Sequence, residues 1–324
     1  MGEIRVGVVG VGYLGQFHAE KYANMEGVEL VGVVDIDSSR AKVIAERFRT
    51  QPFLHHSSLI NKVQAVSIAV PTLLHYSIAK DFLLQGIDVL LEKPLTSTLE
   101  EADELIEIAE SKGLILQVGH LERFNGAFSA LERIIHSPVY IESHRLSPFP
   151  GRGTDVNVVL DLMIHDIDIL LSQVNSMVRK IDALGIPILT SHSDIANARI
   201  EFENGCKANL TASRVSREKV RKTLIFQPNG TLSADYLNQK ASFTKRVRYQ
   251  TKGKIVEIVT EEIPVTRVDP LQVEIHSFLE RVRDRGAARV SGRDGKRALE
   301  VALWIIQKID EDTQTRGIER SSDG

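Results

Sequence analysis

A glycine-rich motif near the amino terminus constrains the fold more than any other feature of this chain. The run Ile4–Val9, which is apolar except for Arg5, is directly followed by the segment Gly10–Gly15, which has the spacing G-x-G-x-x-G. A mostly apolar run of this length is typical of a strand covered on both faces, and the residues after the motif, including Phe17 and Tyr22, begin a helical pattern. A strand, a glycine turn and a helix in this order predict the first unit of a doubly wound sheet.

The motif also predicts a ligand. Gly10 permits a tight turn, Gly12 lets backbone N–H groups approach a pyrophosphate, and Gly15 lets the helix pack closely on the strand. A helix amino terminus with exposed N–H groups favours such an anion. The sequence therefore predicts a dinucleotide site.

An acidic residue indicates which dinucleotide binds. The second predicted strand, Leu30–Val34, is followed by Asp35. Its carboxylate can accept hydrogen bonds from both ribose hydroxyls and would repel a 2′-phosphate, which favours NAD over NADP. Arg40 lies nearby and could weaken that preference. The alternative is a purely structural turn with a solvated aspartate.

Strand and helix patterns alternate through the first part of the chain. The clearest helix is Glu100–Lys112, for which Ser97 and Thr98 offer capping-box starts. Such alternation predicts a Rossmann domain over residues 1–121, with a parallel sheet between helices. The further runs that we expect to form buried strands are Ala65–Val70, Val89–Leu91 and Leu114–Val118.

The pattern changes beyond residue 121. Apolar residues then recur at every second position, as in a sheet with one wet face, which predicts a second α/β domain over residues 122–311. We expect residues 312–324 to form a disordered tail. The expected helices are Arg123–His136, Asn157–Ser172, Leu271–Arg283 and Gly295–Glu311, and the expected strands include Leu224–Phe226, Ala241–Tyr249 and Ile255–Thr260.

Composition excludes several classes of protein. The 324 residues include 40 Lys and Arg against 43 Asp and Glu, a net charge of −3 that gives no basic excess for binding nucleic acid or an anionic membrane. Cys206 is the only cysteine, so no internal disulfide can form. No apolar run reaches the roughly 18 residues of a membrane span. We expect a soluble cytoplasmic protein with no nucleic-acid or membrane partner.

The segment Glu92-Lys93-Pro94 is a second candidate for chemistry. It follows a predicted buried strand, at the sheet edge where doubly wound folds bind ligands. A lysine there supplies a positive charge and a transferable proton, both useful beside an alcohol that is being oxidised. The alternative is that Glu92 and Lys93 form an ordinary surface pair.

A third candidate is a polar stripe on an otherwise apolar helix. Asp161, His165, Asp168 and Ser172 are spaced by four, three and four residues and so share one helical face. Histidine can take a hydroxyl proton near neutral pH, and a carboxylate one turn away can orient it. The alternatives are a satisfied buried polar cluster or a metal site of histidine and carboxylates; we expect no metal.

Together these motifs resemble the Gfo/Idh/MocA family of sugar dehydrogenases, which includes glucose–fructose oxidoreductase and inositol dehydrogenase. The resemblance spans nearly the whole chain and includes the segment Ala69–Thr72 with His75. It implies a Rossmann domain followed by an α/β domain with a large open, mostly antiparallel sheet. It also implies NAD or NADP as cofactor and a homodimer or homotetramer packed through those sheets.

The resemblance also assigns roles to individual residues. Lys93, Asp161 and His165 match the family's catalytic trio, in which either Lys93 or His165 fits the role of base. We expect these three, with Arg123 and Asn125, to contact the substrate. The residues expected to line the cofactor are Gly10, Gly12, Tyr13, Leu14, Gly15, Asp35, Arg40, Pro71, Thr72, His75, Glu92 and Lys93.

Two stretches, His120–Phe128 and Ser213–Gln227, resemble the UDP-N-acetylglucosamine 3-dehydrogenase branch of the family. This implies hydride transfer to NAD from C3 of that nucleotide sugar, giving the ketone. Arg145, Arg152 and the segment Arg214–Lys219 are candidate diphosphate contacts, although ordinary surface charge explains them equally well. Two other functions stay open: an NAD-dependent glycoside hydrolase of the same family, and a non-catalytic dinucleotide-binding sensor.

Overall fold

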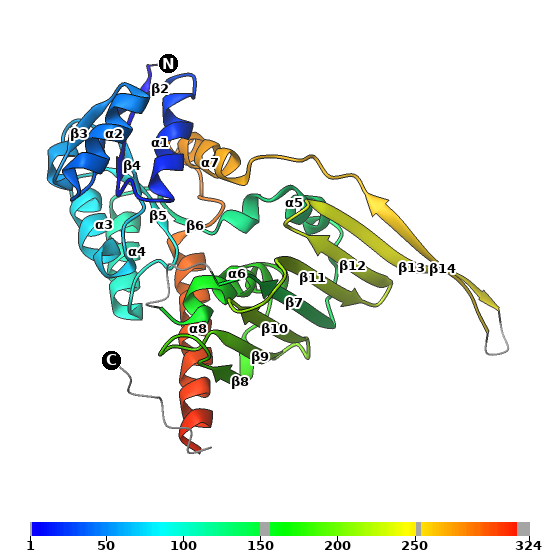
Figure 1. The fold of residues 1–324 in the computed structure, drawn as a ribbon. Coiled ribbons are helices and arrows are strands. Elements are labelled where there is room, and N and C mark those ends of the chain that lie inside the picture. Colours follow the sequence, from blue (N-terminus) through cyan, green and yellow to red (C-terminus); the bar gives the residue numbers. More distant parts are fainter. Residues whose placement is uncertain (1, 150–155, 251–253, 316–324) are drawn as a thin grey trace. The chain divides into compact units, whose positions relative to one another are not determined.

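The protein forms two compact units. The computed structural model describes residues 2–149, 156–250 and 254–315 (Figure 1). Unit 1 comprises the chain up to Leu121 together with Asp269–Leu299, and unit 2 comprises Glu122–Val268 and the chain from Glu300 onwards. Among the described helices, none is both long and apolar enough to cross a membrane.

Unit 1 contains a parallel sheet of six strands in the order β3-β2-β1-β4-β5-β6. The chain begins in the middle of the sheet, builds outward to β3 and then crosses to the other side, so the order reverses between β1 and β4. This is the Rossmann topology that the sequence predicts. The strands are β1 (Ile4–Val9), β2 (Val28–Val34), β3 (Gln51–Phe53), β4 (Ala65–Ile68), β5 (Asp88–Glu92) and β6 (Leu116–Gly119).

Helices cover this sheet. The helix predicted at Glu100–Lys112 is present as α4, and Thr98 and Glu101 form its capping box. The helical elements of unit 1 are α1 (Gly15–Ala23), α2 (Ser38–Phe48), α3 (His75–Leu84), α4 (Leu99–Ser111) and α7 (Pro270–Asp284), with 3₁₀ turns η1 (His56–Leu59) and η2 (Thr72–Leu74).

The helix α7 belongs to unit 1, whereas the sequence-based division assigns its residues to the second domain. Its buried side chains Leu271, Ile275 and Phe278 join the same core as Tyr22 of α1. An ion pair of 2.6 Å between Lys21 and Asp269 connects the same two helices. The apolar stripe of α7 identifies it as a helix but does not specify which sheet it covers, and so the linear division was wrong here.

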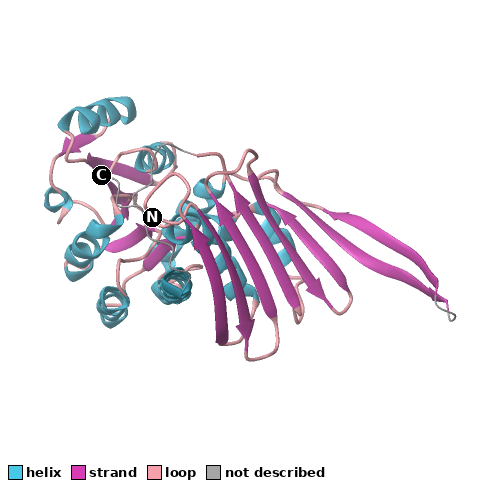
Figure 2. Ribbon diagram, turned by 60° about the horizontal axis from the view of Figure 1, so that its bottom comes forward, coloured by secondary structure: helices cyan, strands magenta, loops and turns pink. Residues whose placement is uncertain are grey.

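Unit 2 contains a mixed sheet of eight strands in the order β14-β13-β12-β11-β7-β10-β9-β8. All neighbours are antiparallel except β7 and β10, which confirms the expected large, mostly antiparallel sheet. Helices lie against one of its faces (Figure 2). The strands are β7 (Tyr140–Leu146), β8 (Val178–Ile186), β9 (Ile195–Phe202), β10 (Lys207–Ser213), β11 (Val220–Gln227), β12 (Gly230–Asp235), β13 (Lys240–Gln250) and β14 (Lys254–Ile263).

The remaining helices differ from the sequence prediction in three ways. A single helix expected over Arg123–His136 is a 3₁₀ turn followed by a short helix, and a π-helical turn begins the helix expected over Asn157–Ser172. The last helix continues to Thr315, so a disordered tail from Asp312 was wrong for its first four residues; residues 316–324 lie outside the described part. These elements are η3 (Leu121–Phe124), α5 (Gly126–Glu132), η4 (Val159–Met163), α6 (Ile164–Gln173) and α8 (Gly292–Thr315).

Candidate active site

The glycine-rich loop connects β1 to α1 in a tightly constrained path. Gly10 has a φ of +82°, a left-handed conformation that side chains disfavour, and its N–H donates to the carbonyl of Val34 at 2.8 Å. A Cβ on Gly15 would lie 1.8 Å from the carbonyl oxygen of Gly10. Both glycines are therefore required by the folded chain itself.

Gly12 has no such internal requirement. Its φ is not in the left-handed region, and a Cβ placed on it would meet no protein atom within 4 Å. The loop is thus open on the side that Gly12 faces, where a side chain would block the close approach of a ligand to the backbone. This open cradle fits the pyrophosphate of a dinucleotide.

Asp35, directly after β2, holds this loop. Its Oδ2 accepts the N–H of Val11 at 3.1 Å and its Oδ1 accepts the N–H of Asp37 at 3.0 Å. The guanidinium of Arg40 lies 3.2 Å from both carboxylate oxygens. The structure therefore brings Asp35 and Arg40 to the loop, as the sequence predicts, and shows a loop-fixing role for Asp35 that the motif does not reveal.

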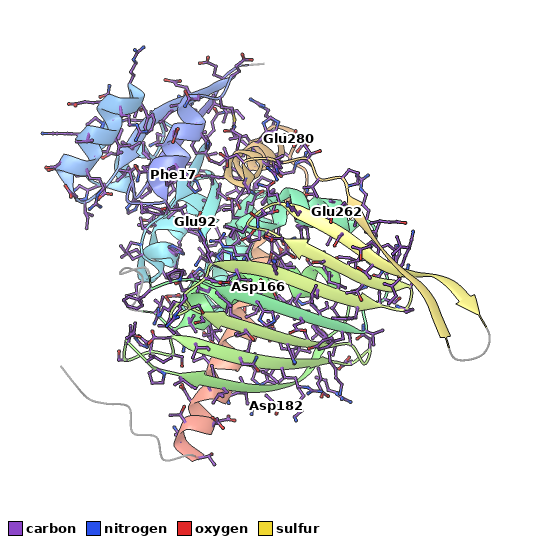
Figure 3. All side chains as sticks on the ribbon, turned by 45° about the vertical axis from the view of Figure 1, so that its right-hand side comes forward. Phe17, Glu92, Asp166, Asp182, Glu262 and Glu280 are labelled. Carbon is purple, nitrogen blue, oxygen red and sulfur yellow. The ribbon has the colours of Figure 1, made fainter. Side chains whose placement is uncertain are left out.

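The other residues expected at the cofactor follow the strands next to β1. Pro71 and Thr72 come after β4, and Glu92 ends β5 (Figure 3). Because all strands of this sheet are parallel, these residues lie at the carboxyl edge where the glycine loop also lies. Tyr13, 62% exposed, stacks edge-on with Phe17 at 5.7 Å between ring centroids, and Leu14 is partly buried.

His75 does not fit the role expected for it. The side chain is 1% exposed, with Nδ1 2.8 Å from the carbonyl oxygen of Pro94 and Nε2 2.9 Å from that of Val70. Burial lowers the pKa of His75 below its usual value, although both carbonyls and Glu92 favour the charged form. Both ring nitrogens face protein oxygens, so the ring connects two loops and offers no nitrogen to a cofactor.

The segment around Lys93 is also held by hydrogen bonds to buried side chains. The carboxylate of Glu92 lies 3.1 Å from Nε2 of the fully buried His18, and its other oxygen accepts the N–H of Lys93 at 3.3 Å. The Lys93–Pro94 peptide bond is cis. The sequence-based alternative, an ordinary surface pair of Glu92 and Lys93, is wrong because Glu92 is buried.

In unit 2, Asp161 and His165 lie close together along the chain. Asp161 is in the π-helical turn η4 and His165 in the first turn of α6. Both side chains are partly buried, and His165 lies between the buried residues Ile164 and Asp166. π-helical turns are rare in proteins, and those that occur are often found at functional sites. The stripe predicted from helical spacing does not continue beyond them, because Asp168 is buried against Arg123 and Ser172 is exposed.

A buried ionic cluster behind this helix was missed by the sequence analysis. Arg145 on β7 donates to both oxygens of Asp166, at 2.7 and 3.2 Å, and to Glu122 at 2.9 Å. Asp166 is labelled in Figure 3. Arg221 reaches the same oxygen of Glu122 at 3.2 Å. Burial alone would lower the pKa of Arg145, but the attraction of the two carboxylates outweighs burial and raises it. The cluster fixes the residue next to His165.

Two proposed diphosphate contacts are therefore wrong. Arg145 is enclosed by Asp166 and Glu122, and the fully buried Arg214 donates to Asp194 at 2.7 Å and to the carbonyl of Val156 at 2.8 Å. Buried guanidinium groups are satisfied by such pairs and cannot reach a ligand. Arg152 lies outside the described residues.

The two expected substrate residues beyond the Rossmann domain also have internal contacts. Asn125 caps α5 by accepting the N–H of Ala127, and its amide donates to Glu122 and to the carbonyl of Tyr236. Both amide N–H groups of Asn125 are therefore used within the protein, and the structure shows a capping role that the sequence does not reveal; its contact with a substrate stays a prediction. Arg123 donates to Asp168 at 3.4 Å and lies over the ring of Phe128.

Within the described residues, no three His, Cys, Asp or Glu side chains lie close enough together to bind a metal ion.

Comparison with known proteins decides the family. Residues 4–120 match the model of an oxidoreductase family with an NAD-binding Rossmann fold, Gfo/Idh/MocA. The UDP-N-acetylglucosamine 3-dehydrogenase of Acidithiobacillus ferrooxidans is 37% identical over 303 residues, which cover 93% of this chain and 96% of that protein. The chain belongs to the Gfo/Idh/MocA family.

Solved structures agree with this assignment. A structure of the same Acidithiobacillus enzyme superposes with a TM-score of 0.89 at 35% identity, covering 96% of this chain and 99% of that one. The scyllo-inositol dehydrogenase of Lactobacillus casei, solved with NAD(H) and scyllo-inositol, superposes with a TM-score of 0.81 at 18% identity over 96% and 98% of the two chains, a likeness of fold alone. Unit 1 of this Gfo/Idh/MocA protein is thus an NAD-binding Rossmann domain of an oxidoreductase.

Proposed function

We propose that this protein oxidises a secondary alcohol of a nucleotide sugar to the ketone with NAD, and that its substrate is UDP-N-acetylglucosamine, oxidised at C3. The observation that supports the substrate most strongly is the 37% identity over 93% of the chain to an enzyme named for that reaction. The open cradle at Gly12 and the acidic Asp35 support NAD as the cofactor.

Different residues of unit 1 would bind different parts of the cofactor. The backbone N–H groups of the Gly10–Gly15 loop would donate hydrogen bonds to the pyrophosphate. The carboxylate of Asp35 would accept hydrogen bonds from the ribose hydroxyls. Two almost fully exposed apolar side chains follow the neighbouring strands: Ile36 is 89% and Leu73 84% exposed. Exposed apolar side chains at a ligand edge are suited to an adenine ring, and we assign Ile36 and Leu73 this role.

The chemistry requires a proton and a hydride to leave the same alcohol. When bound, NAD accepts the hydride from the carbinol carbon. His165 takes the hydroxyl proton, and Asp161 orients its imidazole. Lys93 holds the hydroxyl oxygen by charge and hydrogen bonding and shares the proton relay, so that the C–O bond becomes a carbonyl as hydride and proton depart. Arg123, already paired with Asp168, is the remaining candidate for binding the sugar.

A substrate screen tests this function. The purified protein is incubated with NAD and, separately, with UDP-N-acetylglucosamine, UDP-glucose, free N-acetylglucosamine and myo-inositol, while NADH absorbance and the sugar products are followed. The proposal predicts one NADH and one 3-keto nucleotide sugar per turnover with the first compound, and much slower reaction with the others. Cleavage of a glycoside without net NADH would support the hydrolase instead. Binding of NAD without turnover of any alcohol would support a sensor.

A further inference from the structure

Two buried histidines contact the residues on either side of Lys93. His18 is hydrogen-bonded to Glu92, which precedes Lys93, and His75 to the carbonyl of Pro94, which follows it. We propose that His18 and His75 are positioning residues that fix the turn Glu92–Leu95, here called the Lys93 turn, and thereby hold Lys93 in its catalytic place. This inference rests on the proposed dehydrogenase function.

His18 acts through the carboxylate of Glu92. The histidine is fully buried on α1; its Nε2 lies 3.1 Å from Glu92 Oε1, and its Nδ1 has no hydrogen-bond partner among the described residues. Burying a polar ring is costly unless its hydrogen bonds are made, and within the described part of the chain the one hydrogen bond of His18 is to Glu92. The other oxygen of Glu92 accepts the N–H of Lys93 at 3.3 Å. The contact chain therefore runs from α1 to the backbone of the catalytic lysine.

The neighbouring strand makes room for this carboxylate. Gly119, at the end of β6, is paired with Glu92, and a Cβ on Gly119 would lie 3.0 Å from the Glu92 carboxyl carbon. Such a contact is closer than almost all real ones, so a larger residue at position 119 would displace the carboxylate. Glu92 is thus confined by His18 on one side and β6 on the other.

His75 holds the other end of the turn. Its ring lies between the carbonyl of Pro94 at 2.8 Å and that of Val70 at 2.9 Å, so it connects the segment after β5 to the segment after β4. A neutral ring donates to one of these carbonyls, and a protonated ring donates to both. In either state the polar contacts of His75 go to the Lys93 turn and to the end of β4.

A positioning role makes a different prediction from a general packing role. Displacement of a catalytic group by about 1 Å can reduce turnover by about 100-fold without removing any binding contact. We therefore expect loss of either histidine's hydrogen bond to lower kcat by about 10- to 100-fold while changing the Kd for NAD by less than about 3-fold, because the hydrogen bonds of both rings go to Glu92, Pro94 and Val70 and not to the glycine-rich loop. A packing role would lower the melting temperature and leave kcat of the folded enzyme unchanged.

The experiment compares substitutions that keep or remove the donor. His75→Gln and His18→Gln retain amide N–H groups of similar reach, whereas His75→Phe and His18→Leu fill the space without a donor. His56→Gln is the matched control, since His56 is a partly exposed histidine of unit 1 that pairs with Asp81 at 2.8 Å, away from the turn. Each variant of the full-length protein is assayed for kcat, KM, NAD affinity, melting temperature and amide hydrogen exchange of the peptide containing Lys93.

The expected result is a kcat that falls in the Phe and Leu variants, recovers at least partly in the Gln variants and stays normal in His56→Gln. Faster amide hydrogen exchange at the Lys93 turn should accompany each decrease in kcat. Folded Phe and Leu variants with kcat within about 2-fold of wild type would overturn the proposal. If these variants do not fold, the Gln variants decide the question. A fall in kcat accompanied by faster exchange at the Lys93 turn supports the proposal, whereas a fall in kcat with unchanged exchange, or faster exchange with unchanged kcat, overturns it. If the wild-type protein oxidises no sugar, the proposed function fails, and amide exchange still tests whether the histidines hold the turn.

Discussion

The carboxylate of Asp35 accepts the backbone N–H of Val11 at 3.1 Å, so the end of β2 directly fixes the loop that follows β1. Asp35, which we propose selects the dinucleotide, therefore also shapes the glycine-rich loop proposed to hold the pyrophosphate. A substitution that tests selectivity must keep an acceptor at this position, which makes Asn a better replacement than Ala.

Asp35→Asn should narrow the preference for NAD over NADP. The amide oxygen can still accept from Val11, but the charge that binds the ribose hydroxyls and repels a 2′-phosphate is removed. Hydrogen bonds to charged groups contribute about 1.5–3 kcal/mol, so we expect the ratio of NADP to NAD dissociation constants to fall by about 10- to 100-fold. Titration calorimetry of both dinucleotides measures this ratio. Equal affinities in the wild-type protein would show that Asp35 does not discriminate.

Gly12→Ala and Gly15→Ala should fail in different ways. A methyl group at position 12 meets no protein atom within 4 Å, so Gly12→Ala should keep its melting temperature within about 2 °C and lose NAD affinity by at least about 10-fold. The same methyl at position 15 would overlap the carbonyl of Gly10, so Gly15→Ala should be strongly destabilised. Thermal denaturation and NAD titration of both variants separate the two roles. Normal NAD binding by Gly12→Ala would place the pyrophosphate elsewhere.

Arg145→Met should reduce stability and leave substrate binding unchanged. Removing the guanidinium leaves Asp166 and Glu122 buried with less compensation, and breaking a buried ion pair costs about 3–5 kcal/mol. Urea denaturation measures this loss. In the folded fraction we expect KM for the nucleotide sugar within about 2-fold of wild type. A large rise in KM with unchanged stability would show instead that Arg145 contacts the diphosphate.

Local patterns in the sequence were sufficient to predict the Rossmann domain and its ligand. The glycine spacing, the position of Asp35 and the capping box at Thr98 each depend on residues close in sequence, and the structure contains all three. The apolar stripe of α7 likewise predicted a helix. It did not specify the partner, because α7 packs on α1, more than two hundred residues earlier in the chain.

Side-chain roles that depend on long-range partners could not be read from the sequence. Arg145 appears as a surface charge in the sequence, but its partners Glu122 and Asp166 lie on η3 and α6. Asn125 is also tied to a distant residue, because its amide donates to the carbonyl of Tyr236 in the turn between β12 and β13. His75 matches the family's motif, and only the structure shows that both its nitrogens face carbonyl groups. The placement of Lys93, Asp161 and His165 at one hydroxyl stays a prediction.

The sheet of unit 2 leads to a prediction about assembly. On strands β9 and β10, buried side chains alternate with partly or fully exposed ones, and helices lie against one face of the sheet (Figure 2). A second copy of the chain packed on the other face would bury it, and closed symmetric dimers and tetramers are the common outcome. Sedimentation velocity at micromolar concentration should show a dimer or tetramer. A monomer under these conditions would contradict the prediction.

The most direct test of the account is a double-substitution cycle on Lys93 and His165. General acid–base groups contribute about 10²–10⁴-fold in rate, so Lys93→Ala and His165→Ala should each lower kcat with the nucleotide sugar by an amount in that range. Their NAD affinities should stay near wild type. Because both side chains serve one proton transfer, the double variant should lose much less than the product of the two single losses, and Asp161→Ala should lose less than His165→Ala. Near-normal turnover in His165→Ala would contradict the proton-relay mechanism and leave His165 as a structural histidine.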